Sequence, residues 1–376
     1  MPPKKKPVEK TPLSERMADR LNMEPGEAQE FIDADQDVQM KVFRGLENKN
    51  AKLRAQLKTE KAKREQAEHE LESAEGRVDH MLATQDIVPA GELGTIKKHR
   101  GGEATAILCL SDWHAEETVD ANSVNGLNEF NIDIADERIK RVFEKALYLL
   151  EFARNISTIK DLVVWLGGDL ITGYIHDELV ESNSLSPSEA CLFVQDRVVT
   201  GIDHLKNHAN VKGVTVVTNH GNHGRTTVKK RISTSHKNSY EWLMYNNLAR
   251  MYRKDPLVKW KIAEGYLNYL DIQGHTVRFH HGDGMRYQGG VGGITVPVNK
   301  AIAQYDKQRR AAFDVFGHYH QFMENWRWIC NGAIVGYNAY ALEIKADIQP
   351  PTQSFIVVDK EYGKVMALPI FVDEPL

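Results

Sequence analysis

Five apolar segments of the chain each end in a short cluster of aspartate, asparagine, histidine and glycine residues. The clusters occupy residues 111–114, 167–169, 218–223, 280–282 and 317–320. One such cluster could be purely structural, but five in one chain favour a common site. Carboxylate, amide and imidazole groups together suit divalent metals that accept mixed oxygen and nitrogen ligands, such as Mn, Fe, Zn or Ni. The residue types therefore predict a metal centre built without cysteine.

Asp169 is the best placed of these residues to hold two ions. It follows the apolar run of residues 162–166 and two glycines, so we expect it where a buried strand ends. A carboxylate can bridge two metals through its two oxygens. Two metals about 3.5 to 4 Å apart can share a hydroxide nucleophile and hold both the attacking and the leaving oxygens at phosphorus. The chemistry that this predicts is phosphoester hydrolysis with two divalent metal ions, Mn foremost.

Strands and helices alternate between the clusters. Short continuous apolar runs are typical of strands buried on both faces, and ligands of open α/β sheets lie at the carboxyl ends of such strands. Two runs near the end of the chain, residues 354–359 and 364–371, predict a hairpin. The pattern as a whole predicts an α/β domain over residues 103–376. Helical patterns fall between the runs, over residues 135–154, 188–207, 238–254 and 298–310.

Four segments precede that domain. Residues 1–10, rich in proline and lysine, predict a disordered tail. Residues 11–45 predict a small helical segment that breaks near Pro25 and Gly26. Residues 46–85 predict a coiled-coil arm, and residues 86–102, rich in turn-forming residues, predict a linker.

The arm carries a seam of positions spaced alternately four and three residues apart. Most seam positions are apolar, while the residues between them are mainly Lys, Arg, Glu and Gln. This spacing favours a coiled coil and therefore a homo-oligomer through residues 46–82. Glu60, Arg64 and Gly76 weaken the pattern, and a single solvated helix held by side-chain pairs is the alternative. The seam consists of Leu46, Asn50, Leu53, Leu57, Glu60, Arg64, Ala67, Leu71, Ala74, Val78 and Met81.

Composition narrows the class of protein. The 376 residues are 41% hydrophobic, which suffices for a sizeable core. A formal net charge of -4 does not indicate a broadly basic nucleic-acid-binding protein. The three cysteines are far apart in the sequence, which is typical of reduced thiols. No apolar stretch approaches the length of a membrane span, so we expect a cytoplasmic protein that does not enter the membrane.

The order of the five clusters resembles that of the calcineurin-like metallophosphoesterases, a superfamily that includes DNA repair nucleases. The resemblance covers roughly residues 104–371 and implies a two-sheet sandwich flanked by helices. It also implies that His223 contacts the phosphoryl group without binding metal and protonates the leaving oxygen. Arg225, in the basic loop that follows, could clamp a phosphate oxygen, so we expect His223, Asp169 and Arg225 to be the catalytic residues. The ligands implied are Asp112, His114, Asp169 and His320 for one metal, and Asp169, Asn222, His281 and His318 for the other.

One position departs from the family pattern. An acidic residue that orients the histidine usually follows the Asn-His pair, but Gly224 follows His223 here. Asp177, Glu178 or another acidic side chain could replace it from a loop. Alternatively, His223 serves only as a phosphate contact.

Basic residues in the loops after the metal ligands suit an anionic substrate. Arg225, Lys229, Arg286 and Tyr287 are the expected substrate contacts, although a charged solvated surface would give the same pattern. With the resemblance, they favour a phosphodiesterase or nuclease that acts on nucleic acid. Two alternatives remain: a phosphomonoesterase for proteins or nucleotides, and a non-catalytic phosphate-binding adaptor assembled through the coiled coil.

Overall fold

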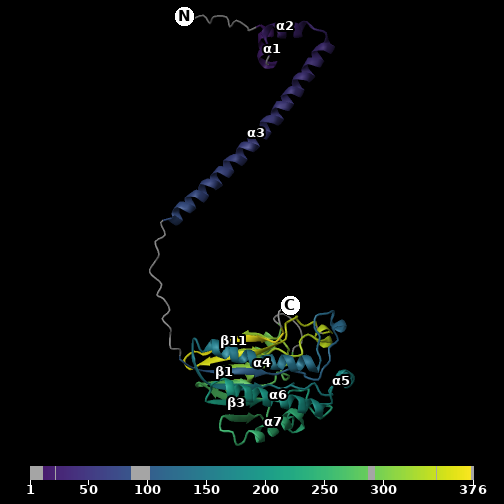
Figure 1. Cartoon of the computed structure of the whole chain (residues 1–376). Coiled ribbons are helices and arrows are strands. Elements are labelled where there is room, and N and C mark those ends of the chain that lie inside the picture. Colours follow the sequence, from purple (N-terminus) through teal and green to yellow (C-terminus); the bar gives the residue numbers. More distant parts are fainter. Residues whose placement is uncertain (1–11, 22, 86–101, 287–292, 344, 374–376) are drawn as a thin grey trace. The chain divides into compact units, whose positions relative to one another are not determined.

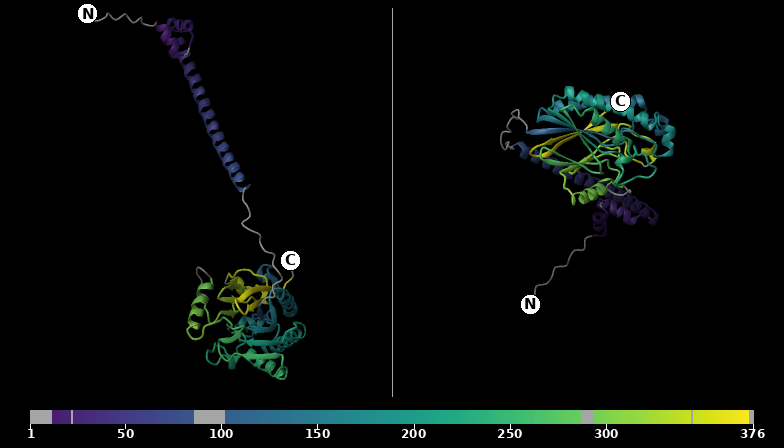
Figure 2. Two further views of the ribbon diagram at one scale, coloured as in Figure 1. Left: turned by 90° about the vertical axis from the view of Figure 1, so that its left-hand side faces the viewer. Right: turned by 90° about the horizontal axis from the view of Figure 1, so that it is seen from below.

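The computed structural model describes residues 12–21, 23–85, 102–286, 293–343 and 345–373 (Figures 1 and 2). The chain divides into two units, Met1–Thr95 and Ile96–Leu376, and each is described by itself. The expected tail of residues 1–10 lies outside the described residues, as does the expected linker apart from residue 102. Among the described residues, no helix is both long and apolar enough to cross a membrane.

The first unit is helical. Its helices are α1 (Leu13–Leu21), α2 (Pro25–Asp33) and α3 (Gln36–Gln85). The break expected near Pro25 separates α1 from α2, because Pro25 opens α2 and the Glu24 and Glu27 side chains form a reciprocal capping box with the backbone. Helix α3 already begins at Gln36, so it spans the whole predicted arm and the end of the segment before it.

The second unit has an α/β architecture with two mixed sheets. The six-stranded sheet has the order β11-β10-β1-β2-β3-β4, in which β1 to β4 run parallel and β10 and β11 pair antiparallel. The expected hairpin of residues 354–359 and 364–371 lies within β10 and β11. The strands of this sheet are β1 (Glu103–Leu110), β2 (Thr158–Leu166), β3 (Gly213–Thr218), β4 (Val258–Ile262), β10 (Thr352–Asp359) and β11 (Gly363–Phe371).

The five-stranded sheet has the order β5-β6-β7-β9-β8. Strand β6 pairs parallel with β7, and β7 pairs parallel with β9, while the two edge strands run antiparallel to their neighbours. The carboxyl ends of β6 and β7 therefore lie at the same edge of this sheet. Its strands are β5 (Asn268–Ile272), β6 (His275–Phe279), β7 (Phe313–Phe316), β8 (Met323–Asn325) and β9 (Trp328–Cys330).

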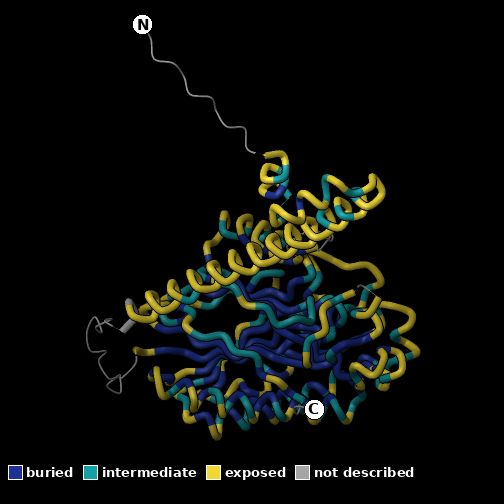
Figure 3. The backbone as a smooth tube through the Cα atoms, turned by 90° about the horizontal axis from the view of Figure 1, so that it is seen from above, coloured by how far each residue is buried: buried dark blue, intermediate teal, exposed yellow. Residues whose placement is uncertain are grey.

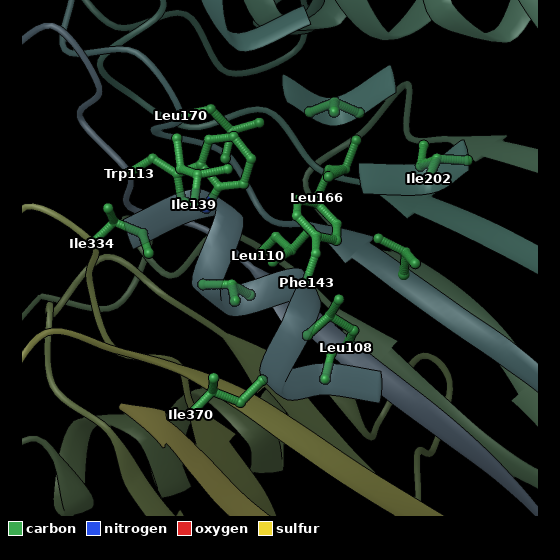
Figure 4. Packing of buried hydrophobic residues seen from close by; sticks show 14 of the residues in the cluster. Leu108, Leu110, Trp113, Ile139, Phe143, Leu166, Leu170, Ile202, Ile334 and Ile370 are labelled. Atoms are coloured by element: carbon green, nitrogen blue, oxygen red, sulfur yellow. The ribbon is translucent and has the colours of Figure 1, made fainter. Parts of the chain in front are cut away.

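Alternation along β1 and β2 feeds two hydrophobic cores. Ile107 and Trp165 belong to a cluster that also contains Val277 and Val315 of the second sheet, so this core joins the two sheets. Leu108 and its neighbours on the other face pack under the helices. Because both faces are covered, these strands read as continuous apolar runs in the sequence. Figure 4 shows Leu108, Leu110 and Leu166 gathered around Phe143 and Ile139 of the covering helix α4.

Three long helices cover the outer face of the six-stranded sheet (Figure 1). They are α4 (Ile132–Ala153), α6 (Pro187–His208) and α7 (Tyr240–Met251), close to the predicted ranges 135–154, 188–207 and 238–254. Each has a polar cap, since the side chains of Asn131, Ser186 and Ser239 accept hydrogen bonds from the first turn. The predicted start of α4 was three residues late and that of α6 one residue late, because their caps lie outside the apolar pattern, whereas α7 begins two residues after the predicted residue 238.

The shorter helices lie in the connections. Helix α5 (Asp177–Ser182) lies within the segment between β2 and α6, and α9 (Ala339–Glu343) precedes β10. Helix α8 (Thr295–Tyr305) begins before the predicted residue 298 and ends well before the predicted residue 310. Residues 306–309 instead make a turn in which the Arg309 carbonyl accepts a hydrogen bond from Arg278.

Arg278 is the centre of a buried ion pair that joins β6 to β7. Its guanidinium donates two hydrogen bonds to the Asp314 carboxylate, at 2.8 Å and 2.9 Å, and neither side chain is exposed. A third hydrogen bond reaches Asp306 after α8. A charge buried this deeply must stay paired, because removing one partner leaves the other uncompensated.

We therefore predict that Arg278→Met destabilises the second unit by about 3 to 5 kcal/mol, because Asp314 loses its partner. The double variant Arg278→Met/Asp314→Leu should recover much of that loss. Urea unfolding followed by tryptophan fluorescence measures the free energy of unfolding of the second unit selectively, because all six tryptophans lie beyond residue 96. Equal destabilisation of the single and double variants would contradict the proposed importance of the pair.

Candidate metal centre

The predicted ligands follow five strands drawn from both sheets. Residues 112 and 114 follow β1, residue 169 follows β2, and residue 222 follows β3, all in the six-stranded sheet. Residue 281 follows β6, and residues 318 and 320 follow β7, in the five-stranded sheet. The candidate site thus lies where the carboxyl ends of both parallel sets of strands meet.

Donor atoms from these residues converge in three overlapping groups. Within each group, one donor atom per residue lies within 4.8 Å of the others. Asp169 belongs to two of the groups and His114 to two, so the groups form one continuous cluster. This arrangement fits a shared carboxylate between two metal positions. The groups are Asp112 with His114 and His320; His114 with Asp169 and His223; and Asp169 with His281 and His318.

Individual contacts show how closely the groups approach. The Nε2 atoms of His114 and His320 lie 3.1 Å apart, and the His281 Nε2 atom lies 2.8 Å from the Asp169 Oδ2 atom. The Nδ1 atom of His281 lies 2.9 Å from the Gly167 carbonyl oxygen. Because a carbonyl only accepts hydrogen bonds, Nδ1 carries a proton and Nε2 is the nitrogen that faces Asp169.

The backbone is strained at several of the predicted ligands. Five of the predicted ligand residues have positive φ angles, between 47° and 72°, a region that non-glycine residues seldom occupy. Backbone hydrogen bonds hold the loops there: the Asp112 N–H donates to the Gly168 carbonyl and the His114 N–H to the Asp169 carbonyl. Such strain is concentrated at functional sites. The five residues are Asp112, His114, Asp169, His318 and His320.

Glycines allow the carboxylates to pack against neighbouring backbone. A Cβ atom on Gly221 would lie 2.0 Å from the Asp169 Oδ1 atom, and one on Gly317 would lie 2.1 Å from the Asp112 Oδ2 atom. Gly168, at φ +90°, would place a Cβ atom 2.2 Å from the Gly221 nitrogen. All three glycines are therefore required by close approach, and Gly168 also by its positive φ angle.

Burial and charge together set the protonation states. Burial raises the pKa of Asp112 to about 7. Burial also favours the neutral form of Asp169, but the charge of His281 outweighs it and the pKa of Asp169 falls well below its usual value. Burial lowers the pKa of His281, yet the Asp169 carboxylate raises it to about 10. The His281 proton thus compensates a buried carboxylate, and a metal ion bound there would displace that proton.

The donor set of these residues fits divalent metal ions. The Asn222 Oδ1 atom is buried and has no hydrogen-bond partner among the described residues. Two carboxylates, one amide oxygen and four imidazoles also match the hard and borderline donors that Mn, Fe, Zn and Ni accept. A buried amide oxygen without a hydrogen-bond donor is a favourable position for a cation.

His223 is positioned by a backbone carbonyl. Its ring Nδ1 atom lies 2.9 Å from the Thr172 carbonyl oxygen, and its backbone N–H donates to the Asp169 Oδ1 atom at 2.8 Å. Neither acidic residue considered from the sequence, Asp177 or Glu178, supplies this partner: both are exposed at the start of α5. The Thr172 carbonyl fixes the tautomer with the proton on Nδ1, so Nε2 is left for the site.

Gly224 makes room for a buried acid that sequence reasoning missed. A Cβ atom there would lie 2.9 Å from the Glu241 Cγ atom. Glu241, fully buried in the first turn of α7, accepts hydrogen bonds from the Leu170 and Gly221 N–H groups, each at 2.7 Å. Its carboxylate therefore holds together the loops that carry the β2 and β3 ligands. Burial, with the nearby Asp169 charge, raises the pKa of Glu241 to about 7.

Gln353 on β10 is a second supporting residue without a sequence signal. Its side-chain oxygen accepts hydrogen bonds from the Ser111 N–H and the Trp113 indole, and its amide donates to the Ser111 carbonyl. These contacts fix the turn that presents Asp112. Gln353 lies between Thr352 and Ser354, before the apolar part of the strand, so its sequence context gave no cue, and its partners are set only by the tertiary fold.

The expected substrate contacts are only partly brought together. A cavity of about 620 Å³ adjoins Asn222, and its lining includes Arg225 and Arg286 but not Lys229. Arg225 donates to the carbonyls of its own loop, including that of Asn222 at 2.9 Å, so it also supports a predicted ligand. Lys229 is exposed. Tyr287 lies outside the described residues.

Comparisons with known proteins add little. Neither a protein-family model nor a curated protein sequence matches the chain. Among solved structures, a hypothetical protein from Pyrococcus horikoshii OT3 has 13% identity and a TM-score of 0.35, over 72% of this chain and 89% of that one. The sulfate thiohydrolase SoxB from Thermus thermophilus, in complex with glycerol, has 9% identity and a TM-score of 0.30, over 75% and 58% of the two chains. Any functional conclusion therefore depends on the geometry of the site itself.

We predict that Gly221→Ala weakens divalent metal binding by roughly 10- to 100-fold, the range typical of residues that orient metal ligands. The added methyl group would displace the Asp169 carboxylate, although the variant keeps every proposed ligand residue in its sequence. Calorimetric titration with Mn²⁺ measures the effect. Gly265→Ala is the matched control, because a Cβ atom at Gly265 meets nothing within 4 Å. Equal affinities for the two variants would contradict the placement of Asp169.

Proposed function

We propose that residues 103–376 form a dinuclear metal-dependent phosphoesterase of the calcineurin-like type that hydrolyses phosphodiester bonds in nucleic acid. One observation carries this proposal: the side chains of five strand ends, far apart in the sequence, converge on a single buried cluster in which Asp169 belongs to two donor groups. Structural histidines at strand ends would have no reason to face one another around a shared carboxylate.

The proposed ligands divide into two sets. Asp112, His114 and His320 would hold one cation, and His281 and His318 would hold the second, with Asp169 between them. The buried Asn222 Oδ1 atom would join the second set. Divalent cations bound there would supply Lewis-acid polarisation of the phosphoryl oxygens and a water molecule activated at neutral pH. The protein's own contribution is to fix these donors in place through strained turns and glycine contacts.

His223 is suited to handle a proton at its Nε2 atom. The Thr172 carbonyl occupies Nδ1, so a proton delivered to a leaving oxygen would come from Nε2. The ring lies within reach of the cluster, since one of its nitrogens belongs to the group with His114 and Asp169. Burial lowers the pKa of His223, against the opposing effect of Asp169. A phosphate anion nearby would favour the protonated ring.

The cavity beside Asn222 supports a diester substrate with further phosphates. Its lining carries four cationic side chains, from Arg225, Lys230, Arg231 and Arg286, and one acid, Asp283, which pairs with Lys230. At about 620 Å³, it is much larger than a single phosphoryl group needs. An excess of positive charge next to the centre would bind the phosphates that flank the scissile one in a nucleic acid strand.

We predict that Asp169→Asn abolishes chelator-sensitive hydrolysis and lowers the metal content. The loss of activity should exceed the roughly 10- to 100-fold effect of changing a residue that only orients the ligands, because here the shared carboxylate itself is removed. Asp161→Asn is the control. It makes the same change at an exposed residue in the first half of β2, away from the strand end that leads to Asp169. Turnover of an aryl phosphodiester with Mn²⁺ and metal analysis of the purified protein are the measurements. Full activity of Asp169→Asn would overturn the dinuclear proposal.

We further predict that the protein prefers an aryl phosphodiester to the matching monoester. In Arg231→Gln/Arg286→Gln, the KM for a single-stranded oligonucleotide should rise and its salt dependence should fall by about two counterions, while the aryl diester is turned over as before. Arg253→Gln/Lys254→Gln is the control, because both residues are exposed and lie outside the cavity lining. Monoester preference would instead support a phosphomonoesterase, and bound metal without turnover of any ester would support a phosphate-binding protein.

A further inference from the structure

Helix α3 exposes an apolar seam to solvent. Figure 3 shows it coloured as exposed along most of its length. The side chains of Leu53, Leu57 and Leu71 are 52%, 59% and 60% exposed, although leucine is favoured in the interior of proteins. A helix of this length that repeats leucines at seam spacing is a typical partner for another helix.

Two charged residues interrupt the centre of the seam. Glu60 and Arg64 lie four positions apart and follow Leu57 at the seam spacing, so they lie on the same face of the helix as the leucines. Within the helix they do not pair with each other: Glu60 pairs with Lys63 at 2.9 Å, and Arg64 pairs with Glu68 at 2.8 Å. A second helix that covers this seam must provide partners for both charges or exclude them.

The seam is symmetric about its midpoint. Counting outward from Ala62, each seam position between residues 46 and 78 has a counterpart at the same distance on the other side. Apolar positions correspond to apolar ones, except for one Asn, and the two opposite charges correspond to each other. The corresponding positions are Leu46 and Val78, Asn50 and Ala74, Leu53 and Leu71, Leu57 and Ala67, and Glu60 and Arg64.

We propose that residues 46–78 of two copies of this chain form an antiparallel two-stranded coiled coil centred on Ala62. The seam alternates between heptad positions a and d. In an antiparallel pair, an a position of one helix faces a d position of the other, so each seam residue faces the counterpart given above. Glu60 of each copy then faces Arg64 of the other, twice by symmetry. This proposal is independent of the phosphoesterase function.

Charge excludes the parallel arrangement at the same register. There, each seam residue faces its own copy, so Glu60 would face Glu60 and Arg64 would face Arg64 within the interface. Like charges at a desolvated contact are destabilising, whereas opposite charges offset part of their desolvation. The flanking positions do not decide the orientation, because each arrangement contains like pairs, such as Glu70 with Glu75 in the parallel one and Lys61 with Lys61 in the antiparallel one.

The charges also fix the register. Sliding one antiparallel helix by a heptad in one direction places Leu57 against Glu60 and Leu53 against Arg64. Sliding it the other way places Glu60 against Leu71 and Arg64 against Ala67. Both shifts bury the charged groups against apolar side chains, which is unfavourable. Polar seam residues are known to specify register in this way, at some cost in stability.

The orientation determines where the helix ends lie. With a rise of 1.5 Å per residue, the two Gln85 termini of α3 would be roughly 70 Å apart in the antiparallel pair and adjacent in a parallel one. Whatever follows α3 in each copy would thus leave from opposite ends of the pair.

Charge exchange on the full-length protein tests the proposal. Sedimentation equilibrium should give the mass of two chains. Glu60→Arg places Arg against Arg twice and should raise the dimer dissociation constant roughly tenfold. The double variant Glu60→Arg/Arg64→Glu restores opposite charges across the antiparallel interface and should recover the original constant. In a parallel dimer the unaltered protein and both variants all place like charges against each other, so the single variant would not weaken the dimer.

Glu65→Arg is the matched control, because it makes the same charge change on an exposed residue off the seam and should leave the constant unchanged. Far-UV circular dichroism checks that α3 stays helical in each variant. A single-chain mass for the unaltered protein at all concentrations would overturn the proposal. A mass of three or four chains would overturn it as well, as would failure of the double variant to recover.

A spin label gives an independent measure of orientation. A label at Asn48→Cys, on the face opposite the seam, should lie about 42 Å along the axis from its copy in the antiparallel dimer and level with it in a parallel one. Cys191→Ser removes the cysteine that is not fully buried, since Cys109 and Cys330 are inaccessible. Pulsed dipolar spectroscopy that gave a distance near 20 Å would contradict the antiparallel arrangement.

Discussion

The second unit is organised around a buried negative charge, the carboxylate of Asp169. Taking an ion out of water is costly unless donors or opposite charges surround it. Here His281 lies 2.8 Å from one carboxylate oxygen, and the His223 backbone donates to the other. The strands that bring these partners belong to different sheets, so satisfying Asp169 also joins the sheets at that edge. A metal pair would meet the same electrostatic requirement, which is why the fold and the proposed chemistry depend on one residue.

Close backbone packing makes that arrangement possible. Gly221 and Gly317 each abut a carboxylate at a distance that no side chain would tolerate, and Gly224 leaves the space that Glu241 fills. Glu241 then ties the β2 and β3 loops through two backbone N–H groups. The departure from the expected Asn-His-acid pattern is thus accompanied by an acid on α7. That acid supports the loops, while a carbonyl orients His223.

Sequence reasoning went furthest where signals are local. The α/β architecture was predicted and is confirmed, because buried parallel strands and capped helices leave continuous or periodic apolar patterns. The clusters at strand ends also pointed to the residues that converge. Glu241, Gln353 and the Thr172 carbonyl could not be found in this way, because their partners lie more than fifty residues away or on the backbone. The positive φ angles of Asp112 and Asp169 are likewise products of tertiary packing.

The same electrostatic rule applies in the arm, but with the opposite outcome. Inside the second unit, the charge of Asp169 has partners within the chain, so its burial is complete in one copy. Within the described part of the chain, Glu60 and Arg64 of α3 pair with exposed residues of the same helix, and the leucines beside them remain in solvent. Exposed ion pairs contribute little, so the helix alone offers no reason for two opposite charges to interrupt a leucine seam symmetrically. A second copy supplies that reason, because only then does each charge meet its opposite as the apolar seam is covered.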